Sequence, residues 1–427
     1  MNKFTGCLIA VLVLGLALAV QAEEDWPPRK SGTEFPLLTG PEGIGTGLGF
    51  VFRDLAGKPY RDLFLHDLIS NTALTQYLVD FSEPDFILKK STLNLIYLYS
   101  HRTGVPHFGL GNRQDLDDGS YYGSETYIGR LSYEVRFGPG LGLGAGAEYH
   151  RTANHDGRLD NPQFLAGHDE LGRPISEVYP ALYRSDDFRF REFTHNWFLT
   201  AFHDNRDNPA FPTRGGYERA RVILVDPRLG ADWSYYHYIA EAAHFFPVKS
   251  GYNVLGAYLR WDRLDGRELP FWDYPSLGHS RLNIASYVDG FGLRGYWENR
   301  FQDQNRALGS LEFRHRTRAE WFNPEWFNFY LGKKPDPDAK EKKPRPKWMG
   351  EPQTVGQMLH DYLINSSTLV FVDAGQTWAD RQRLDHVRLT PGVGLMMYWT
   401  SGLQTRLTVG FSEEMVAYQL WVDCQAF

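Results

Sequence analysis

The sequence lacks most features that mark an enzyme or a disulfide-stabilised secreted domain. It has only two cysteines, Cys7 in the N-terminal apolar stretch and Cys424 near the end, so neither a disulfide framework nor a cysteine-based metal site is expected. It contains no Gly-x-Ser-x-Gly elbow, no His-Glu-x-x-His pair and no phosphate-binding loop. We therefore expect no catalytic residue, no metal and no cofactor. A barrel hydrolase built from the many His, Asp and Glu residues of the loops has no motif in its favour.

Long apolar runs are also missing, except at the N-terminus. Residues 8–20 form an apolar stretch of about 13 residues, shorter than the roughly 20 that a membrane-spanning helix needs. Lys3 precedes this stretch, and Val20-Gln21-Ala22 ends it with small residues where a signal peptidase cuts. We predict a signal peptide at 1–22, with an uncleaved anchor as the other interpretation, and then a short periplasmic N-terminal segment at 23–41.

The chain has no strong excess of charge of one sign. Its net charge is −7 at pH 7, which gives no reason to expect a nucleic acid partner. The mean hydropathy of −0.43 is that of a soluble protein, but aromatic residues make up 15% of the chain, and it has 42 glycines. In a membrane β-barrel only one side of each strand faces lipid, so mean hydropathy hides the membrane contact, and aromatic residues form girdles at both water–lipid interfaces.

The dominant pattern is alternation of apolar and polar residues over segments of about ten residues. Residues 127–137 and 141–149 alternate in this way, with Gly138-Pro139 as the turn between them. In 311–318 four charged residues share one face, which is costly toward lipid but natural toward a wet lumen. A soluble β-sandwich also alternates, but its strands average about five or six residues.

We therefore predict an all-β fold, a closed antiparallel transmembrane β-barrel over residues 42–427. About fourteen strands can be counted from the pattern, and sixteen result if the long polar segment 151–187 conceals two more. The Lys- and Pro-rich insertion at 320–350 is expected to be a solvated loop, or an ordered turn that touches headgroups or a partner. With Phe427 in the periplasm, strand parity places this insertion on the periplasmic side.

Three segments carry a more specific pattern. Residues 204–217 contain Arg-Asp-Asn-Pro, residues 290–296 contain Leu-Arg-Gly-Tyr, and residues 369–378 contain Asp-Ala-Gly. In order and spacing they resemble the barrel domain of the bacterial surface antigen family, which includes the assembly factors BamA and TamA. The resemblance covers about 194–427. Before that region only the strand rhythm matches.

The resemblance implies a long extracellular loop that folds back into the barrel lumen. Its motif residues are Gly292, Leu293, Arg294, Gly295 and Tyr296. The family's carboxylate partners of the motif arginine correspond to Glu312 and Asp373, and Glu312 also lies on the charged face noted above. Glycines permit tight bends, and a guanidinium between carboxylates can bind them bidentately. The alternative is that Arg294 is an arginine of a surface loop.

The sequence departs from the family in ways that bear on function. An extra stretch, 281–289, precedes the motif, and Asp423 and Gln425 interrupt the apolar pattern of the last strand. The segment 23–41 is too short for a periplasmic polypeptide-transport domain, so we expect that this chain does not receive client proteins alone. We expect an outer-membrane barrel of a Gram-negative bacterium that acts in protein assembly, translocation or membrane organisation. A passive pore for small solutes or lipid is the alternative.

The expected partners follow from this location. They are outer-membrane lipid and lipopolysaccharide, together with a periplasmic protein or further copies of the same chain; nucleic acid is not among them.

Overall fold

The computed structural model describes most of the strand-forming part of the chain. The described residues are 32–34, 37–40, 43–70, 74–111, 119–156, 175–178, 189–209, 211–248, 253–266, 269–278, 292–316, 366–379, 386–398 and 404–423. The expected signal peptide at 1–22 and the insertion at 320–350 lie outside them, as do residues 281–289, Cys424 and Phe427.

The described residues form one sheet of eighteen strand segments, with three short helices between them. The first ten segments are β1 (Gly32–Glu34), β2 (Leu37–Gly40), β3 (Gly43–Phe52), β4 (Asp62–Ser70), β5 (Leu74–Pro84), β6 (Ser91–His107), β7 (Ser120–Arg136), β8 (Leu141–Asp156), β9 (Arg189–Phe193) and β10 (Asn196–Asp204). The remaining eight are β11 (Gly215–Val225), β12 (Tyr235–Val248), β13 (Asn253–Gly266), β14 (Asn305–Arg316), β15 (Ser366–Trp378), β16 (Arg388–Tyr398), β17 (Gln404–Phe411) and β18 (Val416–Asp423). The helices are η1 (Leu55–Gly57), α2 (Ile175–Val178) and η3 (Pro227–Leu229). None of the helices in these residues is long and apolar enough to cross a membrane.

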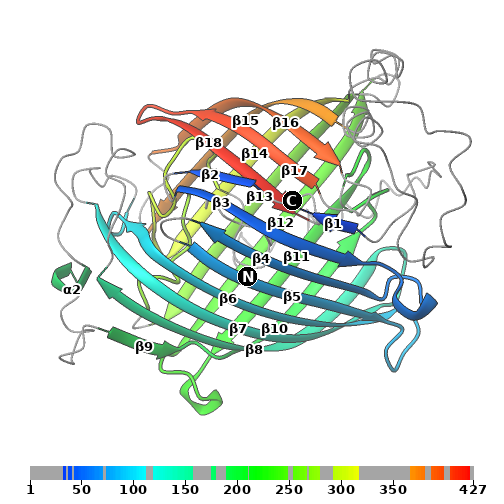
Figure 1. Cartoon of the computed structure of the whole chain (residues 1–427), viewed down its shortest axis with the longest axis horizontal. Helices are drawn as coiled ribbons and strands as arrows, with labels where there is room; N and C mark the ends of the chain where they lie inside the picture. The colour runs from blue at the N-terminus through cyan, green and yellow to red at the C-terminus, as the bar shows by residue number, and fades with distance from the viewer. Residues whose placement is uncertain are drawn as a thin grey trace, which may run out of the picture.

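The strands form an antiparallel meander that curls round a common axis (Figure 1). From β10 to β18 each strand pairs with the next one along the chain, and the same holds from β2 to β8. In the strand order β18 stands beside β2, and β8 pairs with β10. Short connections between sequence neighbours produce this order without crossovers.

Two of the eighteen segments are continuations of others. Gly32 of β1 pairs with Val51 and Leu37 of β2 pairs with Thr46, so both segments follow β3 in one register. Likewise β9 and β10 follow β8 in one register. Merging them leaves sixteen strands, the upper end of the predicted range, whereas the pattern alone gave fourteen.

The missing strands are not where the sequence suggested. Of the segment 151–187, the described residues belong to the end of β8 and to α2. The two additional strands are the β1–β2 strand and one of the pair β4 and β5, since the alternation predicts a single strand, from near Leu68, between the strands that begin near Gly43 and Ser91. The sheet therefore begins before residue 42, inside the segment that the sequence assigned to a separate N-terminal tail.

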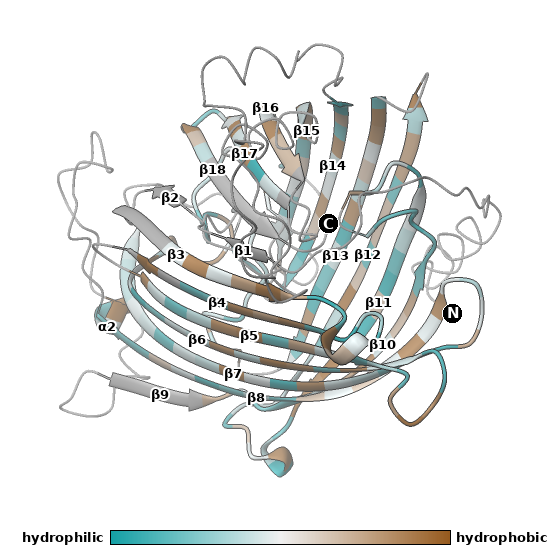
Figure 2. Cartoon of the chain, turned by 45° about the vertical axis from the view of Figure 1, so that its right-hand side comes forward, coloured by the Kyte–Doolittle hydropathy of each residue, from teal (hydrophilic) through white to brown (hydrophobic). Residues whose placement is uncertain are grey.

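The two faces of the sheet have opposite chemistry, as the alternating colours along the strands in Figure 2 show. The face that we call outer carries exposed apolar side chains such as Leu199, Leu259 and Leu311. The opposite, inner face buries charged and polar side chains, among them Arg306 and Arg314. A soluble protein shows the reverse, and a sheet surrounded by lipid requires this arrangement.

Candidate functional site

The connection between β13 and β14 packs against the inner face of the sheet. Its described parts, 269–278 and 292–304, are joined by a hydrogen bond of 2.6 Å from the amide of Leu293 to the carbonyl of Leu277. Both side chains are fully buried, and Tyr296 is 1% exposed. They form one apolar cluster with inner-face residues of β12, β13 and β14. Burial of these side chains stabilises the position of the loop.

Arg294 lies at the centre of this contact and is 2% exposed. It donates from Nε to Oδ2 of Asp373 at 2.8 Å and from Nη2 to Oδ1 at 2.6 Å, a bidentate pair. Its Nη1 donates to Oε2 of Glu312 at 2.8 Å, and Nη2 also donates to Oγ of Ser310 at 3.0 Å. The guanidinium carbon lies 3.3 Å from the centroid of the Phe371 ring. Every edge of the guanidinium is thus engaged.

Strand register brings together the four side chains around Arg294, which we call the cradle: Ser310, Glu312, Phe371 and Asp373. Ser310 lies opposite Asp373, and Glu312 lies opposite Phe371, so β14 and β15 present four adjacent inward side chains to Arg294. The sequence pointed to the two carboxylates only. Ser310 and Phe371 could have been found as well, because each lies two residues from one of them and therefore on the same strand face.

The carboxylates hold the loop arginine ionised. Burial lowers the pKa of Arg294, but Asp373 and then Glu312 more than offset this, so the pKa lies above its ordinary value. Glu312 also accepts hydrogen bonds from Arg314 and from Arg406, at 3.2 Å for the latter. The site is therefore a buried cluster of alternating charges, in which loss of one partner leaves another charge unpaired.

The glycines of the motif permit close approach of backbones. A Cβ atom on Gly295 would lie 2.5 Å from Cγ2 of Thr390 on β16, and one on Gly292 would lie 2.6 Å from the carbonyl of Leu277. From the other side, a Cβ on Gly410 of β17 would lie 2.3 Å from the carbonyl of Arg294. Only glycine fits at these positions without displacement of the loop. Gly410 had no signal in the sequence, since nothing marks it off from the other strand glycines.

Further ion pairs fix the loop at both sides. Arg300 forms a bidentate pair with Glu414 of the β17–β18 turn, with both distances 2.8 Å. Glu298 forms a second bidentate pair with Arg102 of β6, at 2.8 and 2.6 Å. The sequence predicted neither pair, because partners far apart in the chain leave no local pattern.

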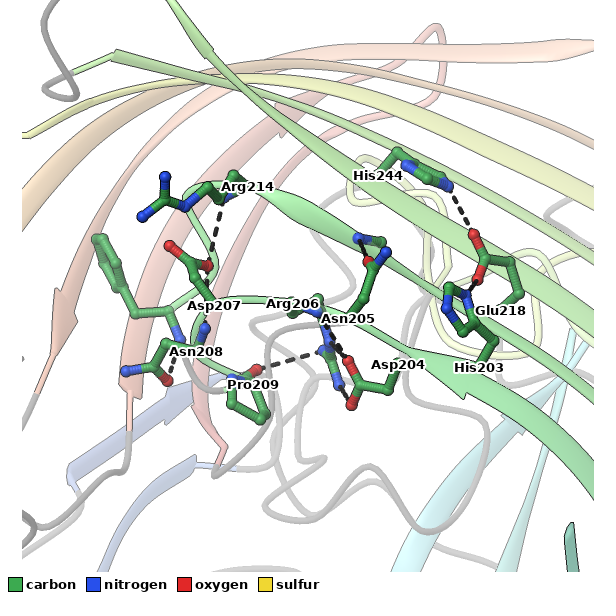
Figure 3. A network of polar contacts seen from close by, with 12 residues as sticks. His203, Asp204, Asn205, Arg206, Asp207, Asn208, Pro209, Arg214, Glu218 and His244 are labelled. Atoms are coloured by element: carbon green, nitrogen blue, oxygen red, sulfur yellow. Dashed lines mark hydrogen bonds and ion pairs between the residues drawn. The ribbon is translucent and has the colours of Figure 1, made fainter. Parts of the chain in front are cut away.

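The Arg-Asp-Asn-Pro segment is a compact turn between β10 and β11, drawn in Figure 3. Oδ1 of Asp207 accepts hydrogen bonds from the amides of Asn208, at 2.9 Å, and Thr213, at 2.9 Å, and Oδ2 accepts one from the Thr213 hydroxyl. Arg206 pairs with Asp204 through Nε and Nη2, both at 2.9 Å. One carboxylate thus satisfies the polar groups of a turn that is too irregular to do so itself.

The β10–β11 turn and the β13–β14 loop contact the same part of the inner face, around Phe371. Phe211 is 3% exposed and packs with Leu369, Phe371 and Met396 of β15 and β16. Phe371 is also the ring that lies under the Arg294 guanidinium. The three motifs that the sequence separates therefore meet around one residue of the inner face.

No group of His, Cys, Asp and Glu that could hold a metal ion is found among the described residues. The geometry at Arg294 consists of charge-assisted hydrogen bonds, and Ser310 donates from its hydroxyl to Oδ1 of Asp373 at 2.7 Å. These contacts hold a loop and a turn against the sheet.

Comparisons with known proteins agree with this architecture. The solved structure of BamA from Haemophilus ducreyi lacking POTRA domains 1–3 has a TM-score of 0.54 and 15% identity, over 92% of this chain and 69% of that one. CdiB from Escherichia coli has a TM-score of 0.52 and 12% identity, over 94% of this chain and 62% of that one. No curated protein sequence matches the chain. At these identities the likeness shows a shared fold. The family model described as the Omp85 superfamily domain matches residues 68–320, more than half of the chain, and the protein therefore belongs to the Omp85 superfamily.

Proposed function

We propose that the chain is a closed outer-membrane barrel of the assembly and translocation type, with the β13–β14 loop folded into its lumen. The observation that carries this proposal is the bidentate pair of Arg294 with Asp373, joined by Glu312, on the inner face of the sheet. A loop held in this way across the inner face would obstruct the steady passage of solutes. It suits a barrel that handles polypeptide or reorganises the membrane around it.

Closure and orientation rest on strand order. The pairing of β8 with β10 and the place of β18 beside β2 support a closed ring, since a free sheet edge is not tolerated in lipid. With sixteen strands both chain ends lie on one side, which we take as the periplasm. The β10–β11 turn is then periplasmic and the β13–β14 loop extracellular. The signal peptide expected at 1–22 supports export to this membrane.

The proposal includes no enzymatic step. It includes outer-membrane lipid and lipopolysaccharide as surroundings, and either a periplasmic protein or further copies of the chain as partners. The chain spans 69% and 62% of the lengths of the two structures above, so the activities of those whole proteins are not transferred to it.

The role in assembly can be tested in a bacterium that carries the gene. Deletion should lower the outer-membrane level of other heat-modifiable barrel proteins, and an Arg294→Ala copy should restore it less well than an Arg294→Lys copy. An unchanged outer-membrane proteome together with altered uptake of small solutes would refute the assembly role.

The alternative is the passive pore. Purified protein in planar bilayers should give small and irregular currents, because the loop occupies the inner face next to Arg294. A large and steady conductance would favour the pore over the proposed role.

A further inference from the structure

A second feature of the inner face lies away from the loop cradle, on β8 and β10. Phe198 pairs with Gly146, and Phe202 pairs with Gly142. A Cβ atom on either glycine would lie only 2.4 or 2.3 Å from the tip of the ring opposite it. The tips of the two rings therefore lie against the backbone of β8, which a larger residue at either glycine would prevent.

Arginines from both sides stack on this pair of rings. The guanidinium of Arg221, from β11, lies 4.7 Å from the centroid of Phe198, and that of Arg130, from β7, lies 5.8 Å from the same ring. Arg136 of β7 lies 5.7 Å from the centroid of Phe202. Stacking on an aromatic face holds a guanidinium in place while its edge stays open to hydrogen bonding.

The arginines differ in whether a carboxylate neutralises them. Arg130 pairs with Glu148 at 2.6 Å, and Arg219, next to Arg221 on the same face, pairs with Glu241 at 2.6 Å. Arg221 donates from Nε to the hydroxyl of Thr200 at 3.0 Å. Among the residues that the structure describes, no carboxylate lies within salt-bridge distance of it.

The local charge is positive as a result. Gly144 lies on β8 between the two glycines opposite the rings. A Cβ atom on Gly144 would lie 3.0 Å from Cγ of Glu134, which is the carboxylate of β7 at this place. Arg130 and Arg219 are neutralised by their carboxylate partners. Arg221 and Arg136 have no carboxylate partner among the described residues, so Glu134 is the one negative charge that offsets their two positive charges. The group thus carries one net positive charge on the inner face, and it attracts an anion.

We propose that Arg221, with Thr200, Phe198 and Arg130, forms a binding site for a phosphate group on the inner face of the sheet. Thr200 and Phe198 fix one edge and one face of the Arg221 guanidinium, so the remaining Nη groups are positioned for a bidentate bond to two phosphate oxygens. Arg130, which is paired with Glu148, stacks on the same ring. This site rests on the proposed barrel only in that the inner face is its lumen; the contacts themselves do not depend on the role in assembly.

The phosphate can belong to a soluble compound or to a lipid headgroup, and titration calorimetry separates the two. Purified protein in a maltoside detergent is titrated with inorganic phosphate and, separately, with dihexanoyl phosphatidic acid. Saturable binding of both with similar affinity identifies the phosphate group of a soluble ligand, and tighter binding of the lipid identifies a headgroup.

The variants test the residues. Arg221→Gln should weaken binding of the better ligand about tenfold or more. Arg221→Lys should weaken it less, because the positive charge remains. Thr200→Val should also weaken it less, because the guanidinium of Arg221 remains. Arg228→Gln is the matched control, since the Arg228 side chain is 91% exposed and pairs with Asp226 outside the sheet. Binding that is absent in the wild-type protein, or equal in the wild type and Arg221→Gln, overturns the site.

A folding check keeps the outcomes apart. Heat-modifiable gel migration of every variant is recorded before titration, so a failure of the barrel itself appears there and not as lost binding. Thr200→Val leaves all charges in place and provides the test if the arginine variants do not fold.

Discussion

At the residue scale, the central feature is a guanidinium whose hydrogen-bonding edges all have partners. Arg294 joins one loop to two strands through Asp373, Glu312 and Ser310. An ammonium group provides one point of charge and cannot bridge a bidentate carboxylate and a second acceptor together. The site therefore depends on the shape of the side chain as well as on its charge.

Arg294→Lys and Arg294→Ala should separate these two contributions. Removing the cation leaves the buried Asp373 without its ion-pair partner, while Glu312 keeps Arg314 and Arg406. Loss of one partner of a buried pair costs about 3–5 kcal/mol. We expect Arg294→Ala to lower the heat-modification temperature of the purified barrel clearly and Arg294→Lys to lower it less. Equal temperatures for the wild type and both variants would mean that the cradle contributes nothing to stability.

Close backbone contact gives a second test at this scale. In Gly410→Ala the added methyl group would lie only 2.3 Å from the carbonyl oxygen of Arg294, so the loop must shift. Gly129→Ala is the control, because the nearest atom to its Cβ is 3.9 Å away, on Tyr149. Limited proteolysis of the loop should accelerate in Gly410→Ala and stay unchanged in Gly129→Ala. Cleavage of both variants at the wild-type rate would contradict the close approach of Gly410 to the loop.

Part of this site is predictable from the sequence. Glu312 was placed on a charged strand face by alternation alone, and Arg294 and Asp373 came from motifs in a fixed order. Gly410 and Glu414 could not be found, since a partner across the fold leaves no trace in the local sequence.

At the element scale, the β10–β11 turn shows how one side chain organises a connection. Asp207 accepts hydrogen bonds from backbone amides of the turn and so fixes its shape. In this shape Phe211 of the turn packs against β15 and β16. Asp207→Asn keeps the size but replaces one acceptor oxygen by a donor, which leaves a buried group unsatisfied at a cost of about 1–3 kcal/mol.

We expect Asp207→Asn to reduce the heat-modification temperature and to increase exchange of the amide of Thr213 with solvent. Asp226→Asn in the exposed η3 turn should leave both unchanged, since its partner Arg228 is solvent-exposed. Slow exchange of Thr213 in the Asp207 variant would show that the carboxylate is not needed.

The β13–β14 loop should respond to pH. Burial raises the pKa of both Asp273 and Asp303, which lie in its two described parts. In the range above the ordinary pKa of 3.8 and below the raised values, the docked loop binds more protons than the undocked loop. Its docking is therefore strongest at low pH and weakens as the pH rises through the raised values.

Hydrogen exchange of residues 292–304 between pH 4 and pH 7.5, corrected for intrinsic rates, measures this dependence, in roughly the range where shifted carboxyls titrate. Protection should fall as the pH rises, and the slope should flatten in Asp303→Asn. A protection that rises with pH would contradict the burial of these carboxyl groups.

The strands themselves were largely predictable from alternation, with two instructive exceptions. The alternation predicts one strand in place of β4 and β5, because only residues 71–73 separate them and no Gly or Pro marks the break. The β1–β2 strand was missed because Pro36 and Pro41 suggest a loop, whereas its pairing with β3 comes from tertiary context.

At the scale of the whole molecule, the fold class followed from the sequence because lipid imposes a simple rule. Outer-face positions are apolar and inner-face positions are polar, so period two is present in nearly every strand. The convergence of the three motifs around Phe371 could not be foreseen, since it depends on how far a turn and a loop reach across the sheet.

The most direct measurement of the central claim is a double-mutant cycle between Arg294 and Asp373. The free energy of unfolding in detergent is compared for the wild type, Arg294→Ala, Asp373→Ala and the double variant. We expect a coupling energy of about 1–3 kcal/mol, since residues in one buried ion-pair network do not act independently. Strictly additive losses would show that the two side chains do not meet, and the loop would then lack this anchor on the inner face.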